Sequence, residues 1–196
     1  ADNDVEFDCG FQIWYPAQPS DASAPGADLQ AGQWFVVGST TDNIAASVSA
    51  TNTAQTVEVA TLNAIDVTAS IAYPQTNPNA NTGTTDQTVT ITNTGNTALD
   101  NEISGDVMCT SYGPPCTGSS FGPEQQKFDL TASVDYTSKT FTLAATATPA
   151  TIETVLATST ATTTAETDLT YWGIAIPNGQ PGGDYTGQNT FSAVAD

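Results

Sequence analysis

Residues 127–150, KFDLTASVDYTSKTFTLAATATPA, alternate between apolar and polar positions along most of their length. Alternation with period two is typical of β-strands that turn one face toward a core. The stretch therefore predicts two strands of a half-buried sheet, with a turn near its middle. The apolar positions are Phe128, Leu130, Ala132, Val134 and Tyr136, followed by Phe141, Leu143, Ala145 and Ala147.

Segments of the same kind follow one another from Trp34 onward, each short and bounded by turn residues. Strands at intervals of about 8 to 12 residues are typical of a β-sandwich. We therefore predict an all-β fold, an Ig-like antiparallel β-sandwich with a jelly-roll arrangement as the variant. The other expected strands lie within residues 33–39, 44–50, 56–73, 87–95, 99–108, 168–177 and 184–195, the last two forming a closing hairpin across NGQPGG.

Charge is the most unusual global property, because the chain has 21 Asp and Glu residues but only 2 Lys residues, which gives a formal charge of -19. Such a chain cannot neutralise phosphates, so nucleic acid is excluded as a partner, and an anionic membrane surface would repel it. The commoner explanation of this acidity is that it keeps a protein soluble in an acidic or salty extracellular medium. The alternative is Ca²⁺ held by carboxylates such as Asp2, Asp4, Glu6 and Asp8. No EF-hand spacing appears, so we expect a solvated strand face and no cofactor.

The absence of His bears on catalysis. It removes the usual general base for Ser and Cys nucleophiles and the commonest ligand for zinc or copper. Two carboxylates could hydrolyse a glycoside, but among this many acids an accidental pair is expected, and no motif singles one out. We therefore expect no enzymatic activity, no catalytic residue and no metal site.

Three cysteines occur, at positions 9, 109 and 116. Cys109 and Cys116 flank a Pro-containing loop, CTSYGPPC, and are close enough for a local disulfide in an oxidising exterior. The alternative is two free thiols near one turn. Cys9 is then left over, either as a buried free thiol or as an intermolecular link.

The chain has two lysines and no arginine. Lys127 and Lys139 could form amide bonds with Asn or Asp inside the sandwich. Ordinary surface lysines are the commoner case and the expectation.

Four aromatic residues could form a platform on which sugars stack. Packing in cores and interfaces is the commoner use of such side chains, and we expect it here. The four are Trp14, Tyr15, Trp34 and Trp172.

The N-terminal segment DNDVEFDCGFQIWY (residues 2–15) is strongly amphipathic, with Val5, Phe7, Cys9, Phe11 and Ile13 on one face. Pro, Gly, Ala and Ser then dominate as far as residue 32, which is typical of a linker. We divide the chain into an N-terminal strand (1–15), a linker (16–32) and a β-sandwich domain (33–196). The start at Ala1 and the absence of a long apolar run suit a mature extracellular protein whose signal peptide was removed, with no membrane insertion.

Two stretches carry a resemblance to a known family. TVTITNTGNTALDNEISGDVMC (88–109) resembles a recurring strand and turn of archaeal and bacterial surface β-sandwich proteins, and YWGIAIPNGQPGGDYTGQNTFSA (171–193) resembles their closing hairpin. Together with the N-terminal strand, the arrangement is similar to the TasA-like biofilm fibre proteins and archaeal bundling pili. The match covers about half the chain.

The resemblance implies a structural subunit of an extracellular filament that polymerises head to tail by donor-strand complementation, for surface attachment or biofilm scaffolding. The donor residues would be Val5, Phe7, Cys9, Phe11 and Ile13, and the partner another copy of the chain. An amphipathic strand behind a spacer can add to an open sheet edge of a neighbour, which fits this mechanism on physical grounds. The same strand could instead fold back onto its own sandwich. The alternative function is a monomeric adhesin or surface-lattice domain that binds glycan.

Overall fold

The computed structural model describes residues 10–21, 32–41, 47–113, 115–146, 156–159, 161 and 164–195. Nearly all regular structure in these residues is antiparallel β-strand, so the prediction of an all-β sandwich is confirmed. None of them form a helix with the length and hydrophobicity needed to cross a bilayer. The elements are β1 (Trp34–Thr41), β2 (Ser47–Val57), β3 (Ile65–Val67), β4 (Gln87–Asn93), β5 (Leu99–Gly105), β6 (Met108–Ser111), β7 (Thr117–Phe121), η1 (Pro123–Gln125), β8 (Gln126–Asp129), η2 (Tyr136–Ser138), β9 (Phe141–Thr142), β10 (Thr167–Ile174) and β11 (Asn189–Ala195), where η1 and η2 are 3-10 turns.

The larger layer is a five-stranded sheet in the order β3-β4-β10-β8-β9. β10 lies at its centre and pairs with β4 on one side and β8 on the other. In β4, Val89 and Ile91 alternate with threonines and are both completely buried. This alternation directs one face of the sheet toward the second layer.

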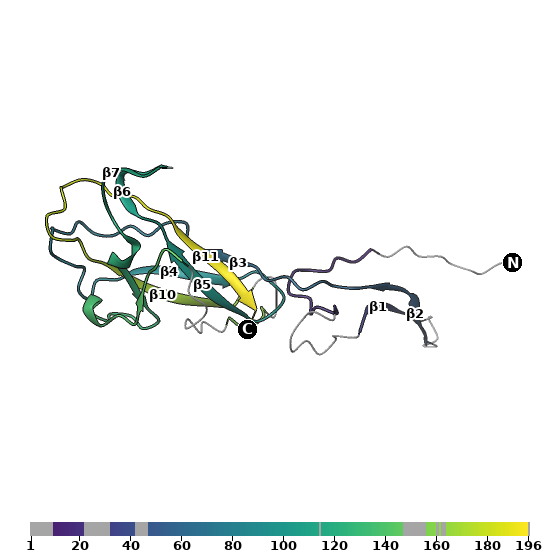
Figure 1. Ribbon diagram of the computed structural model, residues 1–196. Helices are drawn as coiled ribbons and strands as arrows, with labels where there is room; N and C mark the ends of the chain where they lie inside the picture. The colour runs from purple at the N-terminus through teal and green to yellow at the C-terminus, as the bar shows by residue number, and fades with distance from the viewer. Residues whose placement is uncertain are drawn as a thin grey trace.

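The second layer is built around β5 and β11, which pair from Leu99↔Ala195 to Gly105↔Asn189 (Figure 1). The chain continues from β5 into β6, which pairs with β7 and, through Cys109, with Thr186. Residues 99–109 and 186–195 therefore run beside each other.

Aromatic rings join the two layers at the centre of the core. The ring of Trp172 on β10 is fully buried, with centroid distances of 4.7 Å to Phe128 and 5.9 Å to Phe191 of β11. Leu143 packs against Gly105 so closely that a Cβ at that glycine would collide with the leucine side chain. Each fully buried apolar side chain contributes about 1.5–3 kcal/mol, so this cluster is the main source of stability.

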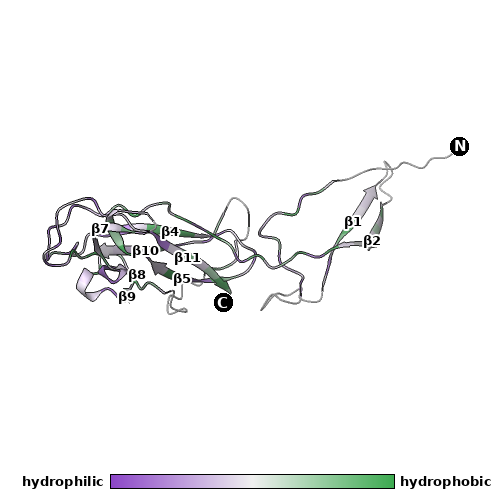
Figure 2. Ribbon diagram, turned by 45° about the horizontal axis from the view of Figure 1, so that its top comes forward, coloured by the Kyte–Doolittle hydropathy of each residue, from purple (hydrophilic) through white to green (hydrophobic). Residues whose placement is uncertain are grey.

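β1 and β2 form a separate two-stranded sheet that projects from one end of the sandwich (Figures 1 and 2). Every residue of β1 is exposed, and the exposed fractions of Val37 and Val48 reach 56% and 71%. A two-stranded ribbon in water is marginally stable by itself. The projection therefore presents apolar side chains that no described part of the sandwich covers.

Two strand predictions were wrong. Residues 168–177 and 184–195 do not form a hairpin, because β10 pairs with β4 and β8 in one layer whereas β11 pairs with β5 in the other. The predicted strand 127–136 ends at Asp129, whose side chain accepts hydrogen bonds from the main-chain N–H groups of Thr131 and Thr140. A carboxylate that caps nearby N–H groups favours a turn over a continued strand.

The expectation of two ordinary surface lysines was wrong for Lys139. Its side chain is completely buried and its Nζ lies 2.6 Å from Oδ1 of Asp86. Lys127 is half-buried, and its Nζ lies 5.1 Å from the centroid of the Tyr136 ring. Neither lysine projects freely into water.

Candidate assembly site

The structure describes only part of the predicted donor strand. Val5, Phe7 and Cys9 lie outside the described residues, and so do the acidic positions 2, 4, 6 and 8. From Gly10 to Trp14 the chain has no regular secondary structure, and a turn follows in which Ala17 N–H donates to Trp14 O. The exposed fractions are 61% for Phe11 and 56% for Trp14. The described end of this segment is therefore not part of its own sandwich.

The residues after this turn are attached to the base of the projecting hairpin. Trp34 Nε1 donates to Gln18 O, and Ser20 exchanges hydrogen bonds with the main chain of Val59. Both carboxylate oxygens of Asp21 accept from Thr61, at 2.6 Å each. Within the stretch expected to be a linker, residues 18–21 are thus held by hydrogen bonds, while residues 22–31 are outside the described set.

A shallow hollow of about 310 Å³ lies where this segment meets β1. Phe11, Ile13, Trp14 and Trp34 line it. Trp172 takes no part, because it is buried in the core of the sandwich, so a sugar platform containing all four aromatic residues is excluded.

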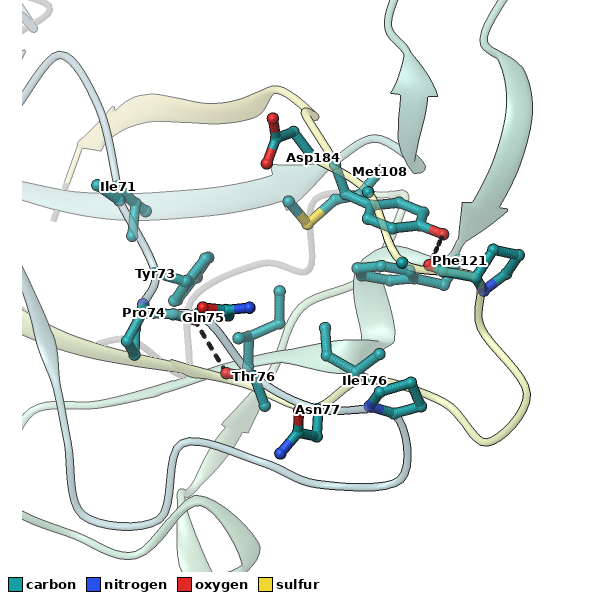
Figure 3. Close-up of a pocket in the computed structure, with 17 residues that line it drawn as sticks. Ile71, Tyr73, Pro74, Gln75, Thr76, Asn77, Met108, Phe121, Ile176 and Asp184 are labelled. Carbon is teal, nitrogen blue, oxygen red and sulfur yellow. Dashed lines mark hydrogen bonds between the residues drawn. The ribbon is translucent and has the colours of Figure 1, made fainter.

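A larger groove of about 730 Å³ is lined in part by β6 and β7 (Figure 3), and these strands lie at the end of the sandwich remote from the β1–β2 hairpin (Figure 1). We call it the distal groove. One wall is residues 71–78, the loop between β3 and β4, and the other is residues 181–185, in the connection from β10 to β11. Its floor is apolar and consists of Met108, Phe121, Ile174 and Ile176.

Side-chain contacts hold both walls in place. In the 181–185 wall, Tyr185 packs on Phe121 with ring centroids 5.0 Å apart and donates its hydroxyl to Pro181 O at 2.8 Å. In the other wall, the Tyr73 hydroxyl donates to Oε1 of Gln126, and burial raises the pKa of Tyr73, so it stays neutral. The groove is therefore formed before any partner binds.

The main chain of both walls has free hydrogen-bonding groups. Within the described residues, no main-chain N–H from Ala69 to Asn77, nor from Gly182 to Tyr185, donates a hydrogen bond. Main-chain N–H groups without a partner are the groups to which an added strand binds. Asp184 is the one carboxylate in the lining of the groove as described.

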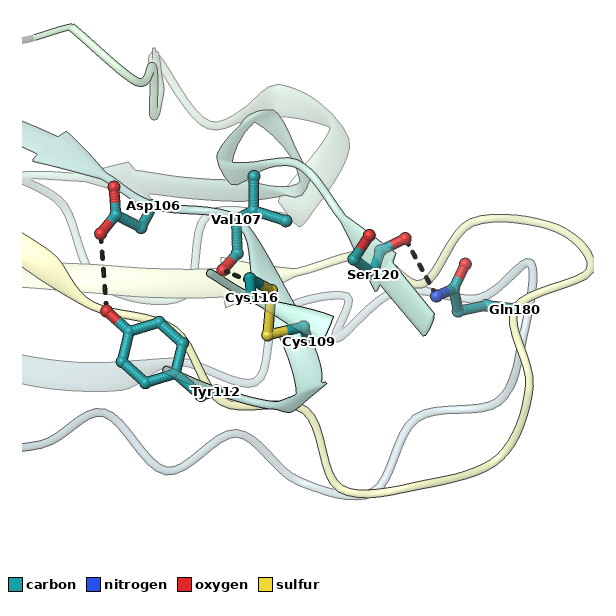
Figure 4. Close-up of a disulfide and its surroundings, with 7 residues drawn as sticks. All are labelled: Asp106, Val107, Cys109, Tyr112, Cys116, Ser120 and Gln180. Carbon is teal, nitrogen blue, oxygen red and sulfur yellow. Dashed lines mark hydrogen bonds between the residues drawn. A yellow bond between two sulfur atoms is a disulfide. The ribbon is translucent and has the colours of Figure 1, made fainter. Parts of the chain in front are cut away.

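The predicted disulfide between Cys109 and Cys116 is confirmed, with sulfurs 2.04 Å apart (Figure 4). It joins β6 to the chain just before β7, and these two strands supply Met108 and Phe121 of the groove floor. Gln180 Nε2 donates to Ser120 O and so connects the 181–185 wall to β7. The disulfide therefore supports the floor of the distal groove.

The described residues contain no cluster of three or more His, Cys, Asp or Glu side chains that could hold a metal ion. Comparison with known proteins adds no relative: no family model, no curated protein and no solved structure matches the chain. The resemblance to TasA-like and archaeal bundling proteins thus stays an expectation from the residues quoted above.

Sequence reasoning did not identify the distal groove. Residues 99–108 were expected to form a strand, and Ile174 and Ile176 were assigned to a hairpin. A signal was present in the IAIP segment, where two apolar residues lead directly into Pro and Gly. Apolar residues at the end of a strand, followed by a long connection, indicate that the chain leaves the sheet beside an apolar surface.

Proposed function

We propose that this chain is a structural subunit of an extracellular filament, in which the N-terminal strand of one subunit occupies the distal groove of the next. The observation that carries the proposal is the groove itself, with its apolar floor and its walls of unpaired main chain. It lies at the opposite end of the molecule from the described part of the N-terminal segment (Figure 1). A donor and an acceptor at opposite ends favour head-to-tail association over closed dimers.

The chemistry of the two parts is complementary. Val5, Phe7, Cys9, Phe11 and Ile13 share one face of the segment, and an apolar floor is what such a face requires. Burial of its four large apolar side chains would contribute roughly 6–12 kcal/mol before ordering costs. Main-chain hydrogen bonds to the walls would add specificity for an extended strand. The nine residues from 5 to 13 would span about 30 Å when extended, enough to run the length of the eight-residue wall 71–78.

Charge would set the orientation of the inserted strand. Asp4, Glu6 and Asp8 occupy the face opposite the apolar one, so they would point toward solvent when that face is buried. Asp184 is the one carboxylate described in the lining of the groove. The groove therefore repels the acidic N-terminal strand less than the rest of the acidic surface would. A disulfide-bonded chain also suits the oxidising exterior in which such a filament would work.

Electron microscopy of negatively stained protein tests the proposal. Fibres from the full chain that vanish when residues 1–15 are deleted would support it, and monodisperse particles from both would refute it. The donor face is tested by Phe11→Asp against Gln12→Asp, which adds the same charge one residue along on the other face. The groove is tested by Ile176→Asp against Leu169→Asp, on the exposed side of β10. We expect fibres only from the Gln12 and Leu169 variants.

The second candidate function is that of a glycan-binding adhesin or surface-lattice domain. The observation that favours it is the hollow in which Phe11, Trp14 and Trp34 lie together with partly exposed rings. Aromatic faces of this kind stack on the apolar faces of sugars. A chain that stays monomeric and loses binding to immobilised polysaccharide in a Trp34→Ala variant would favour this function over the filament.

A further inference from the structure

Lys139 is buried in a manner that an ordinary ion pair does not explain. Its side chain has no exposed surface, and the Asp86 side chain with which it pairs is 10% exposed. Burying two charges carries a desolvation penalty that can exceed their attraction. The chain has only two lysines among 21 acidic residues, and it places one of them inside the sandwich.

Hydrogen bonds from neighbouring groups hold the Lys139 amine and the Asp86 carboxylate in contact. Asp86 Oδ1 lies 2.6 Å from Lys139 Nζ, while its other oxygen, Oδ2, accepts the main-chain N–H of Ser133 at 2.6 Å. Lys139 Nζ also donates to Tyr171 O at 3.1 Å. The lysine side chain passes over Gly173 of β10, where a Cβ would lie 3.1 Å from its Cε, so the lysine occupies the space that a side chain would take.

A second carboxylate, that of Asp129, lies near the pair. Burial alone would raise the pKa of Asp129, but hydrogen bonds from Thr140 and Thr131 and the charge of Lys139 lower it below its ordinary value. Both Asp129 oxygens are thereby occupied by Thr131 and Thr140. Asp86, which faces the amine directly, is thus the carboxylate available to react.

We propose that Lys139 and Asp86 become joined by an amide bond between Nζ and Cγ. One proton transfer across the 2.6 Å between Nζ and Oδ1 gives the neutral amine and the carboxylic acid, which are the forms that can react. The amine lone pair attacks Cγ, and the developing charge on Oδ2 is stabilised by the Ser133 N–H. The Cγ–Oδ1 bond then breaks and the hydroxyl leaves as water with a proton from nitrogen. An ammonium and a carboxylate thus give one amide and one water, with no oxidant or co-reactant.

The bond would connect distant parts of the larger sheet. Asp86 immediately precedes β4, and Lys139 lies between η2 and β9, 53 residues away in sequence. In the order β3-β4-β10-β8-β9, β10 and β8 separate the two linked strands. This inference does not depend on the filament proposal, and each can fail without the other.

The arrangement of lysines provides a direct test. The mass of the reduced, tag-free protein should be lower than its sequence mass by one water molecule. Trypsin, acting on the denatured and reduced chain, can cut only after Lys127 and Lys139. An amide at Lys139 blocks the second cut and holds residues 1–127 and 128–196 together, so we expect one branched product of full length.

Asp86→Ala is the matched control and should give three separate fragments, 1–127, 128–139 and 140–196. Because digestion follows denaturation, this control is valid even if the variant folds poorly. Three fragments from the wild-type chain, together with its full sequence mass, would overturn the proposal and leave a buried ion pair. Loss of water accompanied by three fragments would place the modification elsewhere and would overturn it equally.

Discussion

Asn93 is a completely buried amide at the end of β4 that joins three segments of the chain. Its Nδ2 lies within hydrogen-bonding distance of the carbonyl oxygens of Thr97, Leu156 and Ala157, at 2.7–3.2 Å. Its Oδ1 accepts the main-chain N–H of Gly95 at 2.8 Å. The side chain thus closes the turn after β4 and holds the segment that leads toward β10.

We expect Asn93→Ala to lower the free energy of unfolding by about 3 kcal/mol, because several buried main-chain groups would lose their partner. Urea denaturation measures this change. Asn77→Ala is the control, since Asn77 is exposed and its described hydrogen bond uses the main-chain carbonyl. It should change stability by less than about 0.5 kcal/mol. Equal effects of the two substitutions would contradict the role given to Asn93.

Asp129 makes the stability of the fold depend on pH. Its pKa is lower in the folded state, so its carboxylate contributes stability above the unfolded-state pKa of about 3.9, and this contribution is lost as the pH falls through the folded-state value. Acidification also relieves repulsion in a chain of charge -19, which has the opposite sign. The wild-type curve therefore mixes two effects.

The informative quantity is the difference in unfolding free energy between wild type and Asp129→Asn. We expect a clear wild-type advantage near pH 6 that shrinks steadily toward about pH 2, where the wild-type carboxyl is itself protonated. Glu124→Gln serves as the control, because Glu124 is an exposed acidic residue within η1. If the difference in unfolding free energy did not vary with pH, the stabilising effect of Asp129 would not depend on the charge of its carboxylate.

At the scale of the element, β1 and β2 differ from the other strand pairs, because none of their described side chains is buried. Their register also shifts between Phe35 and Val36, which interrupts the ladder near its base. A ribbon of two strands with an interrupted ladder opens at low free-energy cost.

Hydrogen–deuterium exchange should therefore proceed much faster in residues 34–41 than in β4 or β10. In the buried strands exchange requires opening of the core around Trp172, whereas in β1 local fraying is enough. Mass spectrometry of peptic fragments from the monomeric chain lacking residues 1–15 gives the comparison. Equal protection of β1 and β10 would mean that the hairpin is covered in solution.

The elements also show which features a sequence can predict. β4 was recognisable because Val89 and Ile91 alternate with threonine, and the Cys109–Cys116 bond because its ends are only seven positions apart in the sequence. Strand partners were not recognisable, since β10 and β11 are neighbours in sequence but lie in different layers. Asp129 ended a strand whose apolar pattern continued past it. Periodicity records which side of a strand is apolar, whereas local capping and long-range pairing depend on residues far outside the pattern.

Over the whole molecule, net charge opposes any assembly of identical copies. Subunits with a formal charge of -19 repel one another, and the repulsion is screened over about 10 Å at 0.1 M salt. Filament yield, measured by sedimentation, should therefore rise with sodium chloride at constant protein concentration. Filament yield in calcium chloride is then compared with the yield in sodium chloride at equal ionic strength. A higher yield with calcium would indicate that Ca²⁺ bridges subunits in addition to screening their charge. If fibres form equally well at very low ionic strength with a chelator present, neither screening nor cation bridges are needed.

The narrow connection between the sandwich and the projecting hairpin has a mechanical consequence. The hydrogen bonds described there are those of Ser20 and Asp21 to Val59 and Thr61 and those that join residues 60–64 to the turn at residues 94–97. Bending there disturbs these hydrogen bonds, whereas bending the sandwich would deform a packed aromatic core. In a polymer of such subunits, the sandwiches would be rigid and the connections between them would bend. The connections would therefore set the persistence length, and a single substitution at Asp21 would make the whole fibre more flexible without destabilising any sandwich.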